Sequence, residues 1–263
     1  NASEGLRFYL KPDVGRMKEH GIWETIYAAM SQAFFTLSIG IGSLAIFGSY
    51  IGKERRLLGE SINIAVLDTA ISLIAGLIIF PACFAFNVDP GQGPGLIFVT
   101  LPNIFNSMSG GRIWGSLFFI FMTFAAYSTV IAVFENIISF GMDLWGWSRK
   151  KASIINIFLL IALSIPCILG FNVLSWIQPL GEGTSILDLE DFIISYNLLP
   201  LGSLVYLLFC VTRYGWGFDK YLEEVNAGEG IRMPRALRGY LTWVLPIIIL
   251  VVLIQGYINL FGK

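Results

Sequence analysis

AAMSQAFFTLSIGIGSLAIFGSY, residues 28–50, decides how this chain is interpreted. The stretch is long enough to cross a lipid bilayer, which takes roughly 20 apolar residues. Its centre, however, places Gly40 and Gly42 beside Ser38. Backbone that leaves the helix inside lipid is tolerated only where it lines a cavity or is buried in protein. The stretch therefore predicts a helix broken at mid-membrane, which is where secondary transporters hold substrate and ions. Glycines also serve close helix packing, so the two glycines alone leave both interpretations open.

Composition places the rest of the chain in the membrane as well. Of the 263 residues, 56% are hydrophobic and 13% are charged, whereas soluble domains carry about 25% charged residues. We expect an all-α, polytopic membrane protein. The net charge of −1 gives no overall field, so a nucleic-acid partner is not expected. His20 stands alone, and Cys83, Cys167 and Cys210 lie in apolar runs without metal-type spacing.

Six apolar segments are predicted as membrane spans, at about 22–50, 58–86, 113–143, 152–170, 187–212 and 237–260. The links after the first, third and fifth segments hold eleven basic residues, and the other two links hold only Arg112. The positive-inside rule assigns the basic links to the cytoplasm. Both termini are then expected to be extracellular, although residues 1–21 also carry basic side chains. We expect residues 87–112 to cap the outer face as short helices, and the chain to lie in the cell membrane.

Polar residues gather at the predicted mid-depth of the second and third spans. Asp68 sits near the centre of the second span, where a carboxylate costs roughly 2.5–3.5 kcal/mol and needs a partner. Ala125, Ser128 and Thr129 follow the i, i+3, i+4 spacing of one helical face in the third span. Hydroxyls, one carboxylate and freed carbonyls suit Na⁺ better than Ca²⁺, which takes more acidic ligands. The two hydroxyls also fit simple bonding to carbonyls of the same helix, and Glu135 fits either snorkelling or a structural pair.

Several longer motifs resemble the bacterial branch of the neurotransmitter:sodium symporter family. They are FYLKPD at 8–13, SQAFFTLSIGIG at 31–42, SLIAGLIIFPACFAF at 72–86, GPGLIFVTLPNIF at 93–105, FAAYSTVIAVFEN at 124–136, LDLEDF at 187–192, LLPLG at 198–202 and DKYLEEVN at 219–226. The resemblance implies a leucine-transporter-type fold of inverted repeats, of which this chain is the C-terminal part with transmembrane segments six to eleven. We expect the N-terminal half, segments one to five, to be the missing partner.

The resemblance also assigns roles to individual residues. It implies that Thr36 and Asp68 contribute to a first sodium site, and that Ala125, Ser128 and Thr129 contribute to a second. The implied substrate pocket is lined by Phe35, Thr36, Ser38, Ile41, Thr129 and Val133, with Ile41 where the bacterial leucine transporter has an aromatic residue. Asp191 matches the carboxylate of the outer gate, and Asp143 and Tyr50 match the cytoplasmic gate.

The co-transported ions follow in part from electrostatics. Gln32, Thr36 and Ser72 resemble the residues that border chloride in chloride-dependent relatives. Asp68, one helical turn from Ser72, already places a negative charge in that neighbourhood. A second anion in one small site of low dielectric would be repelled. We therefore expect Na⁺ as the coupled ion and do not expect chloride.

These observations favour sodium-coupled symport of an amino acid or a related small amine across the plasma membrane. The alternative is an inactive truncated remnant, or a membrane scaffold or interaction protein without transport of its own. An intramembrane enzyme is disfavoured because the spans contain no histidine and the chain has no nucleophile–base or HExxH pattern. No repeat typical of a channel selectivity filter is present.

Overall fold

The computed structural model describes residues 2–87 and 95–261. Regular structure in these ranges is helical, with an isolated bridge between Arg55 and Glu229. The chain forms two compact units, Asn1–Ile22 with Asn63–Val130, and Trp23–Ile62 with Ile131–Lys263. We call them the first and second units and describe each by itself.

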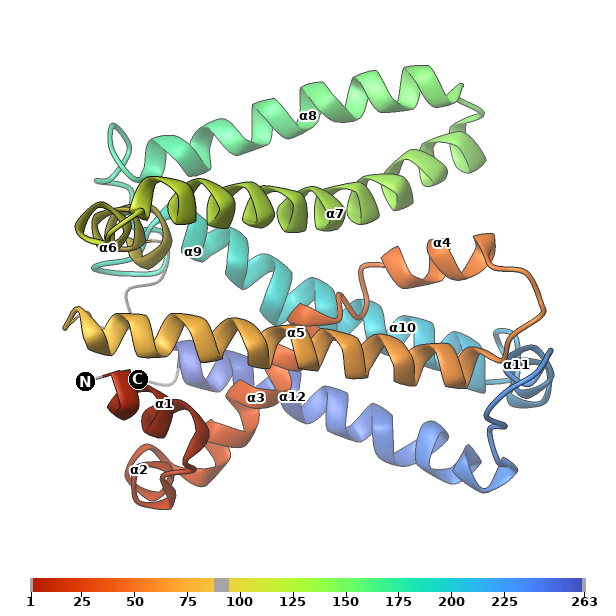
Figure 1. Cartoon of the computed structure of the whole chain (residues 1–263). Helices are drawn as coiled ribbons and strands as arrows, with labels where there is room; N and C mark the ends of the chain where they lie inside the picture. The colour runs from red at the N-terminus through yellow and green to blue at the C-terminus, as the bar shows by residue number, and fades with distance from the viewer. Residues whose placement is uncertain (1, 88–94, 262–263) are drawn as a thin grey trace. The chain divides into compact units, whose positions relative to one another are not determined.

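The segment at 22–50 is broken, as the sequence predicts. Helix α3 (Ile22–Thr36) ends before the glycines and helix α4 (Ser43–Tyr50) begins after them (Figure 1). Ser38, Gly40 and Gly42 between the two helices have φ angles of 49°, 94° and 91°. An L-residue loses energy in this left-handed region, whereas glycine enters it freely. The alternation of glycines therefore ends one helix and lets the next begin.

Within residues 2–87 and 95–261, five helices are long and apolar enough to cross a membrane. Three are uninterrupted: α5 (Leu57–Ala85), α7 (Gly111–Trp145) and α8 (Arg149–Gly170). The fourth runs from Ile186 to Val211 as α9 (Ile186–Asp191), the π-helix η2 (Phe192–Leu198) and α10 (Leu199–Val211). The fifth begins with the 3₁₀-helix η3 (Arg235–Leu237) and the π-helix η4 (Tyr240–Val244) and continues as α12 (Leu245–Phe261). The predicted all-α class is confirmed.

The first unit packs its N-terminal helix against the far end of α5. Helix α1 (Ala2–Leu10) is followed by α2 (Val14–His20). A Cβ on Gly5 of α1 would come within 2.7 Å of the backbone of Phe80, so the two helices approach as closely as backbones allow. The ring of Phe8 lies 5.7 Å from that of Phe80 and 5.2 Å from that of Phe84.

The expected capping element at 87–112 falls partly outside the described residues, which omit 88–94. Its described part is one helical run, made of the π-helix η1 (Leu96–Thr100) and α6 (Leu101–Ser107). Gly111 follows where a Cβ would overlap the carbonyl of Phe105, so the chain turns tightly from α6 into α7.

The second unit has its apolar core around α11 (Phe218–Val225). Helix α10 packs against α12, η2 and α11. The buried side chains of this core cluster are Val211, Phe218, Leu222, Val225 and Met233. Leu57 and Leu58, which begin α5, pack against the same cluster. The start of α5 is therefore anchored to the α11 region.

Candidate functional site

The broken segment between α3 and α4 is held from two sides. From α7, Asn136 donates a hydrogen bond of 2.8 Å from Nδ2 to the carbonyl oxygen of Ile41. From α10, the backbone reaches Gly40 so closely that a Cβ there would overlap the carbonyl of Leu199. A Cβ on Gly202 would in turn overlap the carbonyl oxygen of Gly40. Gly40 therefore serves close packing against α10 as well as the break, so at this position the two interpretations of the sequence do not exclude each other.

A cavity of about 230 Å³ lies along this broken segment. Ser38 and Ile39 line it on one side, and Ser203 and Tyr206 of α10 line it on the other. Ser203 is buried and its hydroxyl donates to the carbonyl of Pro200 at 2.8 Å. Ser43, which begins α4, is also buried, and within the described chain its hydroxyl makes no hydrogen bond. Unwound backbone, two serines and a tyrosine thus border a small hollow whose lining is otherwise apolar.

The predicted sodium ligands lie on three helices. Thr36 is the last residue of α3 in the second unit, whereas Asp68 lies within α5 in the first unit. On α7, the hydroxyl of Ser128 lies 2.7 Å from the carbonyl oxygen of Ala125, and that of Thr129 lies 3.5 Å from it. Three oxygens are therefore close together on one exposed face of α7. Their hydrogen bonds also match the simple bonding within one helix that the sequence left open.

A second hollow, of about 300 Å³, contains the predicted outer-gate residue Asp191. Ser195 donates to its carboxylate at 2.7 Å. Phe35, a predicted substrate residue, lines the same hollow together with Tyr27 and Tyr196, whose ring centroids are 6.3 Å apart.

The π-helix η2 begins next to this hollow, directly after Asp191. Its wide turn is supported by Asn197, which donates from Nδ2 to the carbonyl of Phe192 at 3.1 Å and accepts a hydrogen bond from Tyr257 of α12. π-turns inside α-helices occur frequently at functional sites.

Tyr50, predicted for the cytoplasmic gate, contacts α7 at its hydroxyl. It donates to Glu135 at 2.7 Å and lies 3.2 Å from the hydroxyl of Ser139. Arg149, which begins α8, donates to both carboxylate oxygens of Glu135, at 2.9 and 2.5 Å. Glu135 therefore joins α4, α7 and α8. Asp143, the other predicted gate residue, is exposed one helical turn beyond Ser139 on α7.

Sequence reasoning left Glu135 unassigned and used Arg149 only for topology. Two signals point to the pair: a carboxylate inside an apolar span needs a partner, and Arg149 follows a link of only three residues after α7. The roles of Asn136 and Gly202 had no comparable signal, because an amide or a glycine in a span fits many surroundings.

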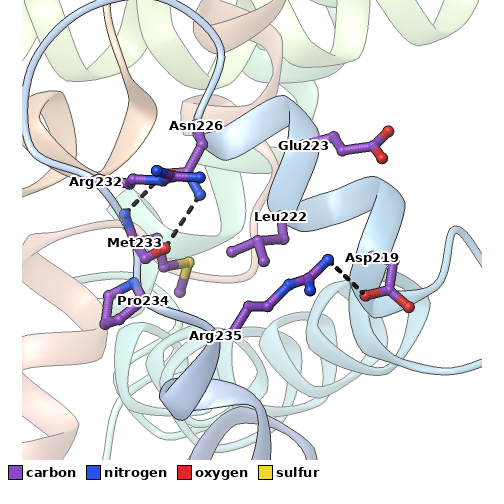
Figure 2. Close-up of a pocket in the computed structure, with 8 residues that line it drawn as sticks. All are labelled: Asp219, Leu222, Glu223, Asn226, Arg232, Met233, Pro234 and Arg235. Atoms are coloured by element: carbon purple, nitrogen blue, oxygen red, sulfur yellow. Dashed lines mark hydrogen bonds and ion pairs between the residues drawn. The ribbon is translucent and has the colours of Figure 1, made fainter.

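A larger surface hollow, of about 660 Å³, is formed by α11 and the segment after it. Figure 2 shows Asp219 and Glu223 on one side and Arg232 and Arg235 on the other, over Leu222 and Met233. Its lining belongs to α11 and residues 232–235, so this hollow is a feature of the α11 region and not of the broken segment.

The arrangement defines a class of protein. A polytopic membrane protein whose apolar helix is interrupted, with the freed backbone held by neighbouring helices beside a small hollow, has the architecture of a secondary transporter. The model of the sodium:neurotransmitter symporter family matches residues 1–262. The chain belongs to this family, which is a family of transporters and not of enzymes.

Individual relatives agree with this assignment. The chain is 31% identical to an uncharacterized sodium-dependent transporter of Haemophilus influenzae, over 99% of this chain and 54% of that protein. It is also 31% identical to an uncharacterized sodium-dependent transporter of Bacillus subtilis, over 99% of this chain and 56% of that protein. The crystal structure of MhsT in complex with L-phenylalanine has a TM-score of 0.83 and 40% sequence identity, over 97% of this chain and 56% of MhsT. The chain thus spans about half the length of these relatives.

Proposed function

We propose that this chain is the C-terminal portion of a transporter that carries an amino acid, or a related small amine, into the cell together with Na⁺. The observation that carries the proposal is the broken segment, which Asn136 and the backbone around Gly202 contact beside a small hollow. Unwound backbone offers carbonyl and N–H groups that a small zwitterion or a cation needs. The likeness to MhsT, which was crystallised with L-phenylalanine, supports an amino acid as the substrate class.

The ion sites follow from the family resemblance and the chemistry of the residues. We assign Thr36 and Asp68 to a first sodium site, and Ala125, Ser128 and Thr129 to a second. The close oxygens on α7 support the second assignment, because Na⁺ is bound by several neutral and anionic oxygens at once. The charge of Asp68 takes the place that chloride has in other members, so coupling is independent of chloride.

The substrate pocket is assigned to Phe35, Thr36, Ser38, Ile41, Thr129 and Val133. Asn136 donates to the carbonyl of Ile41, which fixes the main chain at this position. We assign the aliphatic side chain of Ile41 to the boundary of the pocket. An aliphatic residue here leaves more room than an aromatic one, which favours a bulky apolar substrate side chain.

The remaining assignments concern the membrane and the partner half. From the basic links we assign the Tyr50 end of α4 to the cytoplasmic side of the cell membrane and both termini of the chain to the outside. Asp191 then belongs to the outer gate, and Tyr50 with Asp143 belongs to the cytoplasmic gate. Many large apolar side chains are exposed along α5, α7 and α8, including Leu67, Phe124 and Leu163. Lipid and the N-terminal half, segments one to five, are the partners that cover such surfaces.

The test is sodium-driven uptake in proteoliposomes. The full-length polypeptide that contains this sequence is compared with residues 1–263 alone, using radiolabelled L-phenylalanine and then a mixture of amino acids. We expect uptake by the full-length protein only when Na⁺ is present outside, and none when K⁺ replaces it. Uptake by neither protein with any amino acid would favour the inactive-remnant alternative.

A further inference from the structure

The turn after α4 is attached to the loop after α11 by one arginine. Arg56 lies between α4 and α5, six residues beyond Tyr50. Its guanidinium donates from Nε to the carbonyl of Asn226 at 3.1 Å and from Nη1 to the carbonyl of Gly230 at 2.6 Å. The planar fork of arginine fixes two acceptors at once, which the single ammonium of lysine does not do in the same geometry.

The two backbones also pair directly. The N–H of Arg56 donates to the carbonyl of Glu229 at 3.0 Å, and the N–H of Glu229 donates to the carbonyl of Glu54 at 2.9 Å. Arg55 and Glu229 form a parallel bridge. Gly228 has φ 84°, and a Cβ there would lie 2.5 Å from the carbonyl carbon of Glu54. The loop is therefore built for an approach of main chain to main chain that only glycine permits.

Hydrogen bonds between its two ends also close loop 226–233. Figure 2 shows Asn226 bonded twice to the backbone of Met233: the N–H of Met233 donates to Oδ1 at 2.7 Å, and Nδ2 donates to the carbonyl at 3.1 Å. Met233 is buried in the core cluster, against which Leu57 and Leu58 of α5 also pack. Both chain segments joined at Arg56, the start of α5 and the loop after α11, therefore continue into the same apolar core cluster.

The other attachment of this end of α4 is different in kind. Tyr50 bonds to α7 through its hydroxyl, at Glu135 and Ser139, and the tyrosine is 58% exposed. One side-chain hydroxyl exchanges partners with water readily. Two backbone hydrogen bonds, a forked guanidinium and the adjacent core cluster hold the turn through several contacts at once, so these must break together before the turn leaves the loop. When α4 moves, the contact at Tyr50 is the one that yields.

We infer that Arg56 is a positioning residue for transport: it keeps the Tyr50 end of α4 joined to loop 226–233 throughout the cycle, while the Tyr50–Glu135 contact opens and closes. The inference rests on the proposed function, because it assigns Arg56 a part in the movement that transport requires. It predicts that α4, the start of α5 and the α11 region move as one body.

Substitution at Arg56 gives the first test, in the full-length protein. For Arg56→Ala we expect the maximal uptake rate per folded transporter to fall at least tenfold, while the amino-acid concentration at half-maximal uptake changes less than twofold. Arg56→Lys restores the charge but not the fork, and is expected to give an intermediate rate. Arg55→Ala is the matched control, since its side chain is 73% exposed, and it should leave both quantities unchanged. An unchanged maximal rate in Arg56→Ala would overturn the inference.

Reversible cross-linking gives a second test that does not depend on removing a contact. Arg55→Cys with Glu229→Cys links the bridge partners, and Tyr50→Cys with Ser139→Cys links the gate. Both pairs are made after Cys83, Cys167 and Cys210 are replaced by alanine, and are joined with a short bis-methanethiosulfonate reagent. We expect the bridged 55–229 protein to keep at least half of its uptake, and the bridged 50–139 protein to lose it until a thiol reductant is added.

The outcomes separate this inference from the proposed function. If the unbridged parent takes up amino acids and the 55–229 bridge stops it reversibly, the turn and the loop must part and the inference is wrong. If the unmodified full-length protein takes up none, the proposed function fails. The cross-linking rates then still test whether the turn stays joined to loop 226–233. The cysteines at 55 and 229 should react at the same rate in Na⁺ and in K⁺. A rate that changes with the ion, or a failure of these adjacent cysteines to react, contradicts the inference.

Discussion

The amide of Asn136 lies 2.8 Å from the carbonyl oxygen of Ile41, a backbone group in the segment between α3 and α4. The break therefore does not leave its main chain without support. A carbonyl inside an apolar protein needs a donor, and α7 supplies it through a neutral side chain that adds no charge to the hollow. The segment is thereby fixed in the conformation that presents its remaining polar groups.

The first prediction concerns this hydrogen bond. In Asn136→Ala the carbonyl of Ile41 loses its donor, which costs about 1–3 kcal/mol for a buried group. We expect sodium-dependent binding of the amino acid to weaken roughly five- to 150-fold, measured by scintillation proximity on the purified full-length protein. Asn63→Ala, at an exposed position of α5, is the control and should bind normally. Normal binding by both variants would remove Asn136 from the site.

A second prediction tests the contact between Gly40 and α10. Gly202→Ala places a methyl group where the carbonyl oxygen of Gly40 lies, so one of the two backbones must shift. Overpacking of this kind costs about 1–3 kcal/mol. We expect a lower thermal unfolding temperature and weaker substrate binding. Gly239→Ala is the matched control, because no atom lies within 4 Å of its added Cβ. Equal melting temperatures for the two variants would contradict the close packing.

The break at 38–42 could be predicted from sequence because its cause is local. Glycine is the residue that reaches positive φ freely, and the structure uses that freedom at Gly40 and Gly42. The long apolar helices were predictable for the same reason, since length and hydropathy are properties of one segment.

The partners of the break could not be predicted, because they depend on how distant segments meet. Nothing in the residues near Asn136 says that its amide reaches Ile41, 95 positions away in the chain. In the sequence, Arg56 is one of several basic residues that only indicate the orientation of the chain in the membrane. In the structure, its guanidinium donates to two carbonyl oxygens about 170 positions further along the chain. The family resemblance supplied the roles of residues such as Ser128 and Asp191, which their local spacing alone left open.

A third prediction concerns the ion pair at the start of α8. Glu135 is 8% exposed and both its oxygens accept from the more exposed Arg149, so Glu135→Gln replaces a buried acceptor of two charged hydrogen bonds with an amide that can accept one. We expect a clear drop in the thermal unfolding temperature of the full-length protein. Glu224→Gln, which breaks the more exposed pair with Lys53, should lower it much less. A drop of equal size in the two variants would mean that Glu135 does not join the three helices.

A fourth prediction addresses the coupled ions. Asp68→Ala should sharply raise the sodium concentration at half-maximal uptake, because the carboxylate is the anionic ligand we assign to the first sodium site. Uptake by the unmodified protein should be the same when gluconate replaces chloride, whereas Asp68→Asn should require chloride to restore the missing charge. Sodium dependence that does not change in Asp68→Ala excludes Asp68 from the ion site. Loss of uptake in gluconate by the unmodified protein would show that chloride is coupled after all.

The last prediction concerns the volume of the hollow beside the break. Ser38 lines the cavity of about 230 Å³ and has a φ of 49°. Ser38→Leu adds a branched side chain to a space of that size, so we expect substrate binding to be lost while the protein is still produced and inserted. Ser38→Gly keeps the space and suits the positive φ, and it separates the effect of filling from the loss of the hydroxyl. If Ser38→Leu binds the amino acid normally, the pocket lies elsewhere. If both variants fail equally, the hydroxyl itself contacts the substrate, and the assignment of Ser38 becomes one of hydrogen bonding and not of shape.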